Sequence, residues 1–497
     1  MELELYKEKI EGMNLIFETQ VTQEEVCEAI IPDSQPDILK VMETSVNVLL
    51  KSKEAEQGRA IVKGVLQSTV IYAAEDDNFY KVEIPIPYTV IANCHDINDD
   101  YAVLAVTDIL SADAFISNSR KIVVKANYIT NIHVFGNYTV EFCCKVENDD
   151  VYQLIDEVHI PFLNEYKEKT FVISDDIALE NSDGCNFEIL SAEFSVKNVD
   201  YSISGSRILI RGTAETNLTL LFSDRIVPEK FIKKSDFSQI LDTDASELDN
   251  IKINIMLTGC YCDAAMHSAE NDMQSVSIEL HAVTQCEIYK KKETTVMRDL
   301  YCVYGDIICT TEEITVFSGD NLKCETIKHH DKFENMLELK EIISAKIQFG
   351  EVNIENNTAK FNGTFYAYGI DGNAIPTVFK HNLTFKYKTD VVHVPKIRLL
   401  SINTEIISNE INIDLEIELI SKEKVTTRFI TVNAAEIQEN NKWDSAYSAV
   451  LCELKENETL WDIAKRNLSS VDIIKKFNNI DSETNIEAGT ILLVPKA

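Results

Sequence analysis

The sequence predicts a mainly β protein: three tandem antiparallel β-sandwich or barrel-like domains, followed by a small α+β module of βααβ order. Three observations support this fold class. Apolar and polar residues alternate along much of the chain, for example over residues 275–282. Two short landmarks recur at intervals of about 150 residues. From residue 446 onward, apolar residues take a helical spacing between two short strands.

The first landmark is a five-residue segment near the start of each predicted domain. It reads Asp37-Ile38-Leu39-Lys40-Val41, and its counterparts begin at Glu188 and Glu341, at separations of 151 and 153 residues. Weaker copies occur at 108–112 in the first predicted domain and at 398–402 in the third. They predict that each domain contains two similar sheet-forming halves.

The second landmark is a glycine in an apolar strand that follows the first landmark. It falls at Gly64, Gly212 and Gly363, at separations of 148 and 151 residues. Two landmarks with one period predict a repeated domain of about 150 residues, which is too long for a solenoid repeat. The predicted organisation is three β domains at 1–150, 151–293 and 294–437, a linker at 438–445 and the module at 446–497.

The first half of the module is a predicted strand followed by a helix. Val450, Cys452 and Leu454 occupy alternate positions, so that they share the face of this strand that turns toward a core. Thr459 is suited to cap the helix. Apolar residues at i, i+3 and i+4 within 460–464 give that helix a buried face.

The second half of the module is a predicted helix followed by a closing strand. Ser470 can cap the helix, which has apolar residues on one side over 471–477. Asn478-Asn479 ends it, because asparagine tolerates the left-handed conformation that a helix terminus needs. The closing strand covers 491–494, and Pro495 ends it.

This module resembles a LysM domain, a βααβ fold that binds the N-acetylglucosamine chains of peptidoglycan and chitin. Thr459-Leu460-Trp461-Asp462-Ile463-Ala464, Asn478-Asn479-Ile480 and Gly489-Thr490-Ile491-Leu492 occur in the order and spacing of that family. The resemblance implies a sugar groove between two turns. The candidate partner- or glycan-binding residues are therefore Asn457, Glu458, Thr459, Leu460, Trp461, Asn478, Asn479, Ile480 and Asp481.

One departure from the family bears on function. The family usually has Gly-Asp where this chain has Asn457-Glu458. Asn457 can adopt positive φ as glycine does, so the turn is retained. The asparagine side chain and the longer Glu458 would crowd a shallow groove in which backbone groups meet N-acetyl groups. Glycan binding and a purely structural turn are both open at this point.

The two tryptophans of the chain lie at or just before the module. Trp461 either packs in the module's core or contacts a partner, because indole offers a large area at low entropic cost. Trp443 lies in a polar stretch that has no predicted core to join. It suggests a docking strap between the third domain and the module.

The first predicted domain resembles a SPOCS domain, the β-rich domain of spore-coat assembly proteins in spore-forming Firmicutes. The resemblance rests on 29–41, which contains Pro32-Asp33-Ser34-Gln35-Pro36, and on 60–65 and Ile71-Tyr72. The second and third repeats keep the landmarks without the Pro-x-x-x-Pro segment. Repeated SPOCS-like domains followed by one LysM domain resemble the clostridial coat proteins that interact with the morphogenetic ATPase of the spore surface.

Composition limits the kinds of partner. The formal charge is −35, from 82 acidic and 47 basic side chains, and the body holds almost all of the excess. Such a charge disfavours nucleic acid and anionic lipid and suits a basic protein. The N-terminal residues do not resemble an export signal, and no apolar run is long enough for a transmembrane segment. The twelve cysteines are therefore expected to be reduced thiols in the cytoplasm.

The sequence contains none of the common catalytic motifs that we sought: a P-loop, a Gly-x-Ser-x-Gly elbow or a His-Glu-x-x-His helix. Cys94-His95-Asp96 is interpreted as a loop near a sheet edge, since adjacent strand side chains point to opposite faces. His329-His330-Asp331 is interpreted as a solvated loop. We predict no enzyme, no catalytic residue, no metal and no cofactor. An unrecognised site would need a deep pocket with convergent polar groups.

The resemblances imply a non-enzymatic scaffold or adaptor in spore-coat assembly. Its expected location is the mother-cell cytoplasm at the forespore surface. The module would bind the coat morphogenetic ATPase, and the β repeats would bind coat partners or one another. The alternative is a protein whose LysM domain binds peptidoglycan or another N-acetylglucosamine glycan. The lack of a recognisable export signal favours the scaffold.

Overall fold

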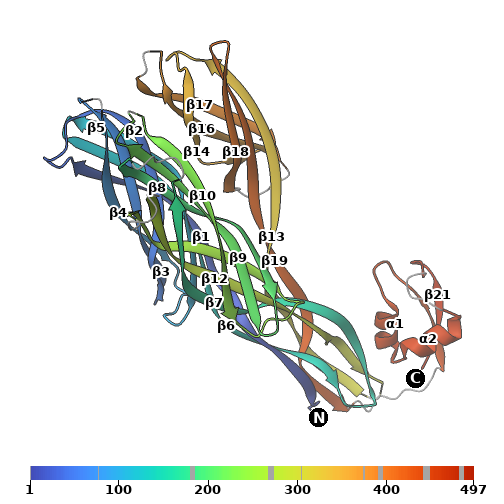
Figure 1. The fold of residues 1–497 in the computed structure, drawn as a ribbon. Helices are drawn as coiled ribbons and strands as arrows, with labels where there is room; N and C mark the ends of the chain where they lie inside the picture. Colours follow the sequence, from blue (N-terminus) through green and yellow to red (C-terminus); the bar gives the residue numbers. More distant parts are fainter. Residues whose placement is uncertain are drawn as a thin grey trace.

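The computed structural model is an elongated β body with a small module beside one end of it (Figure 1). Strands make up almost all of its regular structure, which confirms the mainly β class. The structure describes residues 2–76, 78–179, 185–225, 227–266, 274–303, 305–372, 375–389, 396–439, 448–480 and 486–496.

The body consists of three units with the same order of strands: a long strand, a small sheet, a shorter strand and a second long strand. Unit 1 contains β1 (Leu5–Ile30), β2 (Ile38–Glu56), β3 (Arg59–Ala74), β4 (Phe79–Asn93), β5 (Ala102–Asn118) and β6 (Lys121–Val146). Unit 2 contains β7 (Val151–Ala178), β8 (Phe187–Ile203), β9 (Arg207–Phe222), β10 (Glu229–Asp242), β11 (Asn250–Met266) and β12 (Gln274–Cys302). Unit 3 contains β13 (Gly305–Glu334), β14 (Glu341–Phe349), β15 (Asn353–Glu355), β16 (Thr358–Ile370), β17 (Pro376–Lys388), β18 (Lys396–Ile407) and β19 (Glu410–Glu439).

Each unit contains two antiparallel sheets. In the larger sheet the last long strand lies between the first long strand and the shorter strand, in the orders β1-β6-β5, β7-β12-β11 and β13-β19-β18. The small sheets have the orders β2-β3-β4 and β8-β9-β10, and in unit 3 β16 pairs with β14, β15 and β17. The larger sheets of units 1 and 2 join through one residue pair, Met13 and Leu163. Two sheets per unit agree with the half-repeats of the sequence.

The two sheets of each unit share an apolar core. In unit 1, Val62 and Tyr88 of the small sheet are buried in one cluster with Val124 and Tyr128 of the larger sheet. The rings of Tyr88 and Tyr128 lie 5.0 Å apart. Units 2 and 3 have corresponding clusters. Sheets that pack face to face over one core make each unit a β-sandwich.

The five-residue landmark corresponds to a β-bulge. One residue is left out of the pairing at Leu39 in β2, Leu190 in β8 and Ile343 in β14. The weaker copies do the same at Leu110 in β5 and Leu400 in β18. The strand β11 has a bulge without a landmark in the sequence, and β2, β5 and β8 contain further bulges without one. All six strands lie at the edge of their sheet, where a bulge twists the strand and discourages pairing with foreign strands.

The recurring glycine lies in the central strand of each small sheet, where an aromatic ring of a neighbouring strand covers it. A Cβ atom at any of these three positions would lie closer than 3.0 Å to that ring. A side chain is therefore excluded, and the ring protects the glycine backbone. The glycine and ring pairs are Gly64 with Tyr88, Gly212 with Phe237, and Gly363 with Phe385.

The six long strands continue beyond the sandwiches toward the end of the body that carries the N-terminus (Figure 1). They have 26 to 30 residues each, against about six for a typical strand. Cys143, Met297 and Val432, one from each unit, share a buried cluster there. We call this region the stalk, and its core is common to all three units.

Two predictions need correction. The boundary between 293 and 294 falls inside β12, whose pairing with β7 continues to Cys302. The landmarks lie in edge strands, so they carry no information on where a long strand ends. His329-His330-Asp331 lies in β13, not in a loop. The His329 ring packs against Phe385 at 4.6 Å, and its Nδ1 lies 2.7 Å from the hydroxyl of Tyr387. A segment of mostly polar residues can thus form a strand when one of its faces is in solvent.

Cys94-His95-Asp96 lies in the turn after β4, as predicted. The predicted linker is only partly described: 438–439 belong to β19, and residues 440–447, which include Trp443, lie outside the described residues. The docking strap predicted at Trp443 is therefore not addressed by the structure.

The C-terminal module has the predicted order of elements: β20 (Ala449–Glu453), α1 (Leu460–Asn467), α2 (Val471–Asn478) and β21 (Ile491–Pro495). Thr459 and Asp462 form a capping box at α1. Ser470 caps α2 by accepting a hydrogen bond from the backbone N–H of Ile473. Asn479 ends α2 with a φ of 52°. The caps and the helix end were all predictable because they depend on local residue chemistry.

Candidate functional site

The turn between β20 and α1 is held by its own side chains. Asn457 is exposed and has a φ of 64°, the conformation for which the family uses glycine. The Glu458 carboxylate accepts a hydrogen bond from the backbone N–H of Lys455 at 3.1 Å and pairs with Arg466. Thr459 serves as the helix cap. The side chains of Glu458 and Thr459 are therefore engaged within the module.

The turn after α2 is organised by Asn478. Its amide nitrogen donates to the carbonyl of Leu493 at 2.7 Å, and its Oδ1 accepts from the N–H of the same residue at 2.8 Å. This side chain therefore covers part of the open edge of β21. Asn479 is exposed, and Ile480 packs against the module's core. Asp481 lies outside the described residues.

Leu460 and Trp461 are both buried, but they have different surroundings. Both belong to the module's apolar cluster, and Trp461 also makes a polar contact with the body. Trp461 is 9% exposed and faces the body, where its Nε1–H donates to Asp299 Oδ2 at 2.8 Å. Lys465, one helical turn later, donates to Asp299 Oδ1 at 2.6 Å. Trp461 thus packs in the buried cluster and also bonds to the body of the same chain, and its contact with a partner stays a prediction.

Tyr301 of β12 completes this contact. Its ring meets Trp461 edge-on, with centroids 4.8 Å apart, and stacks on Tyr152 of β7 at 5.1 Å. Its hydroxyl donates to the backbone carbonyl of Ser469 at 2.6 Å. Burial raises the pKa of the Tyr301 phenol above its ordinary value, so the hydroxyl keeps the proton that it donates. We call Asp299 and Tyr301 the anchor, and Trp461, Lys465 and Ser469 the docking face.

A β-bulge orients the anchor. The pairing of β12 with β7 shifts between Met297 and Asp299, which leaves Arg298 as the extra residue. Bulges redirect the side chains next to them. The backbone N–H of Leu300 also donates to Asp299 Oδ1 at 2.9 Å, which fixes the carboxylate. The anchor was missed in the sequence because 162 residues separate Asp299 from Trp461 and no local pattern marks either anchor residue.

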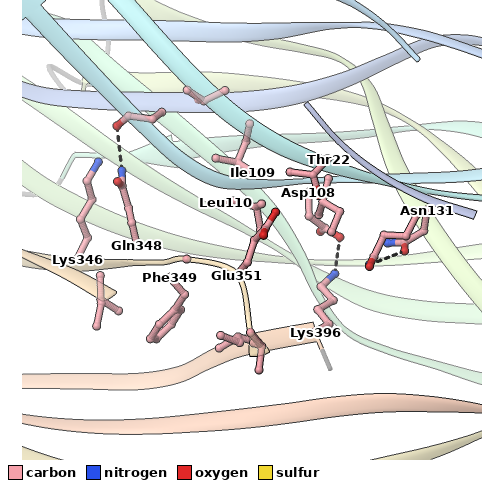
Figure 2. A pocket seen from close by; sticks show the side chains of 18 of the residues that line it. Thr22, Asp108, Ile109, Leu110, Asn131, Lys346, Gln348, Phe349, Glu351 and Lys396 are labelled. Carbon is pink, nitrogen blue, oxygen red and sulfur yellow. Dashed lines mark hydrogen bonds and ion pairs between the residues drawn. The ribbon is translucent and has the colours of Figure 1, made fainter. Parts of the chain in front are cut away.

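A cavity of about 500 Å³ lies between unit 1 and unit 3. Figure 2 shows Lys346 and Gln348 of β14 reaching toward the strands of unit 1. Gln348 donates to the carbonyl of Ala112 at 2.9 Å, and Lys396 pairs with Asp108 at 2.7 Å. These polar groups satisfy one another across the cavity. The cavity is therefore best described as a seam between units.

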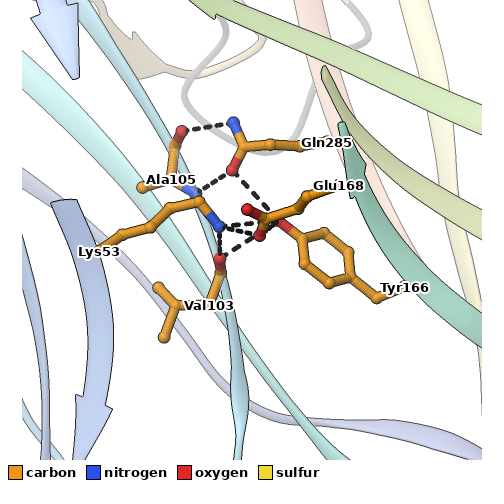
Figure 3. Close-up of polar contacts among 6 residues, drawn as sticks. All are labelled: Lys53, Val103, Ala105, Tyr166, Glu168 and Gln285. Carbon is orange, nitrogen blue, oxygen red and sulfur yellow. Dashed lines mark hydrogen bonds and ion pairs between the residues drawn. The ribbon is translucent and has the colours of Figure 1, made fainter. Parts of the chain in front are cut away.

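A second seam joins unit 1 to unit 2 (Figure 3). The Gln285 amide of β12 accepts from the N–H of Ala105 at 3.0 Å and donates to its carbonyl at 2.9 Å. Lys53, whose side chain is 8% exposed, bonds the carbonyl of Val103 and pairs with Glu168. Burial lowers the pKa of Lys53, although Glu168 opposes this effect. Gln285 of unit 2 and Lys53 of unit 1 thus satisfy backbone groups of the edge strand β5.

Thiol reactivity gives a direct check on burial. Burial raises the pKa of Cys286 to about 12, so its thiolate fraction at pH 8 is about 10⁻⁴. Cys324 is exposed. We expect iodoacetamide at pH 8 to alkylate Cys324 first and to leave Cys286 unmodified in the folded protein, as read by peptide mass spectrometry. Equal rates at the two cysteines would contradict the packing of β12.

Neither helix among the described residues, each with 8 residues, is long enough to cross a membrane. The same part of the chain shows no cluster of three or more side chains placed to hold a metal ion.

Comparison with protein-family models identifies two domains. Residues 37–117, from the landmark of β2 to the end of β5, match the model described as SipL, SPOCS domain. Residues 453–495 match the LysM domain. The curated proteins and the solved structures gave no match. The chain therefore carries a SPOCS domain of the SipL type in its first unit and a C-terminal LysM domain.

Proposed function

We propose that this protein is a non-enzymatic scaffold in spore-coat assembly and that its LysM domain binds the coat's morphogenetic ATPase. The observation that carries the proposal is the presence of a SipL-type SPOCS domain and a LysM domain in one chain. The proposed place of action is the mother-cell cytoplasm at the forespore surface. Binding and scaffold domains of this kind assemble other proteins and need no catalytic centre.

We extend the SPOCS-like assignment to units 2 and 3. Both repeat the strand order of the matched unit, and both carry bulged edge strands. Allowing for the full length of β12, the three domains would end near residues 150, 303 and 439. Three sandwiches on a common stalk present several separate faces, which suits simultaneous contact with several coat proteins. The charge of −35 favours basic surfaces on those partners.

The alternative function is binding of peptidoglycan or another N-acetylglucosamine glycan by the LysM domain. The left-handed backbone of Asn457 favours it, because the family turn is retained. Three contacts weigh against it. Glu458 and Asn478 use their polar groups within the module, and Trp461 is covered by the body. A neutral sugar would have to replace these contacts to use the groove.

Co-purification from sporulating cells tests the proposal. The tagged full chain should recover the morphogenetic ATPase and coat proteins, and the chain without residues 446–497 should lose the ATPase. The full chain carrying Asp149→Ala, in the exposed turn after β6, controls for loss of a charge near the same end of the body. Equal recovery of the ATPase with and without the LysM domain would refute the proposal. Firm retention of the full chain on purified peptidoglycan would support the alternative.

A further inference from the structure

The docking face of the LysM domain is already occupied in this structure. One carboxylate, from Asp299, accepts from both Trp461 Nε1 and Lys465 Nζ, at 2.8 and 2.6 Å. The Tyr301 ring packs edge-on against the indole, and its hydroxyl reaches the carbonyl of Ser469. Two residues of one strand, spaced i and i+2, therefore satisfy three polar groups of the module and cover its tryptophan.

This contact has the composition of a recognition site. Buried tryptophan and tyrosine dominate the energetics of many protein interfaces. A carboxylate that receives hydrogen bonds from a cation and from an indole N–H is a charge-assisted contact of the stronger kind. Asp299 is 24% exposed in its side chain and Lys465 is 40% exposed, so the ion pair lies at the rim, while Trp461 and Tyr301 form the covered centre. A polar rim around an aromatic centre is the usual layout of a protein–protein contact.

We propose that the docking face is the protein-binding surface of the LysM domain and that the anchor is its built-in ligand. The partner segment is an extended strand with a carboxylate and, two residues later, a tyrosine. Binding of that segment displaces the anchor and releases the domain from the body. This inference deepens the proposed function, since it names the surface and the kind of segment that the LysM domain recognises.

The chemistry of the face favours a protein segment over a glycan. Lys465 pairs with a carboxylate. A protein segment can supply such a group, whereas an N-acetylglucosamine chain is neutral and cannot. The carbonyl of Ser469 accepts from a phenol that is stacked on a second ring, Tyr152. The docking face therefore selects a ligand that has both a negative charge and an aromatic ring.

Attachment within one chain makes the anchor a strong competitor. A tethered ligand acts at an effective concentration of about 1 mM, so a free segment of equal intrinsic affinity competes poorly with it. A partner must therefore bind more tightly than the anchor or be present at high local density. The contact keeps the docking face covered until such a partner is present.

The first arm of the test measures the contact without any partner. In the full chain with Trp443→Phe, Trp461 is the only tryptophan, and acrylamide quenching of its fluorescence reports its exposure. We expect weak quenching in this background and a severalfold larger quenching constant when Asp299→Ala and Tyr301→Ala are added. Asp149→Ala is the matched control and should leave quenching unchanged. Lys465→Glu, which places a like charge beside Asp299, should also raise it.

The second arm asks whether the vacated face recognises the segment. A synthetic peptide spanning residues 295–303 is titrated under reducing conditions. We expect it to restore shielding of Trp461 in the Asp299→Ala, Tyr301→Ala protein, with an apparent affinity at least about tenfold tighter than for the chain with an intact anchor. The same peptide with Asp299→Asn should bind more weakly, because it no longer pairs with Lys465.

The outcomes separate the claims. Unchanged quenching in both the anchor variant and Lys465→Glu would show that these residues do not hold the domain, and would overturn the inference. Increased quenching without peptide binding at about 1 mM would overturn the recognition role of the face. Circular dichroism of each variant checks that the β body stays folded. Neither arm contains a coat protein. A negative result in these arms therefore does not bear on the proposed function, which the co-purification experiment tests separately.

Discussion

Replacing Gly64 by alanine will destabilise unit 1 by about 2 kcal/mol, the typical cost of overpacking a filled core. The added Cβ would lie closer than 3.0 Å to the carbonyl oxygen of Leu49 and to the ring of Tyr88. The carbonyl belongs to the backbone of the paired strand and cannot rotate away. The ring is buried between the two sheets of the sandwich, so moving it disturbs the core. Thermal unfolding followed by circular dichroism, with hydrogen exchange of β3 as a local probe, measures the loss.

Gly259→Ala is the matched control. At this position, in β11, the nearest atom to an added Cβ is in the ring of Tyr261 at 3.4 Å, an ordinary contact distance. Alanine also reduces the conformational freedom of the unfolded chain, so we expect no loss of stability and a gain of up to about 1 kcal/mol. Similar losses at the two positions would contradict the assignment of Gly64 as a site required by a covering ring. The corresponding pairs in units 2 and 3 predict the same behaviour at Gly212 and Gly363.

Replacing Gln285 by leucine will open the seam between units 1 and 2 at a cost of about 3 kcal/mol. Gln285 and Ala105 are both fully buried. Leucine has nearly the volume of glutamine, so the change creates no large cavity. It removes three hydrogen bonds, two to the backbone of Ala105 and one from the hydroxyl of Tyr166 at 3.3 Å. It leaves the N–H and the carbonyl of Ala105 buried without partners, and each such group costs about 1–3 kcal/mol. The expected signs are a lower unfolding temperature and faster hydrogen exchange over β5.

Gln20→Leu provides the comparison for this second substitution. Gln20 also bonds through its amide, to Asn131 at 3.0 Å, but it lies on the surface, where water can replace the lost bond. Its effect should stay within about 0.5 kcal/mol. Because a chain of several units need not unfold in one step, the exchange of β5 is the more direct measurement. Unchanged exchange at Ala105 in the Gln285 variant would show that the amide clamp does not hold the seam.

Local chemistry made much of the fold predictable. The mainly β class followed from alternation, and the order βααβ of the LysM domain followed from its caps and helical spacing. The two landmarks were visible because each meets a local requirement that recurs: a bulge in an edge strand, and a glycine beneath an aromatic ring. The bulge at Thr258 in β11 has no landmark, because its strand reads Ile-Met-Leu-Thr-Gly instead.

The candidate site was predictable only in part. Sequence reasoning placed Asn457, Glu458 and Asn478 in the two turns as candidate binding residues and left a purely structural role of the turns open. In the structure Glu458 and Asn478 bond to the module's own backbone. Such side-chain bonds to nearby backbone are a common role of these residue types in turns, and residue identity alone does not distinguish them from contacts to a ligand.

The sequence alone was enough to predict the mainly β class, the recurrence of the two landmarks and the way in which the LysM domain caps its helices, because each depends on residues a few positions apart. Only the tertiary structure decided what the units and the LysM domain contact. Gln285 reaches Ala105 across 180 residues, and Trp461 reaches Asp299 across 162. A side chain that bonds one backbone group or one carboxylate so far away leaves no periodic trace in the chain, since its partner is selected by how the sheets pack.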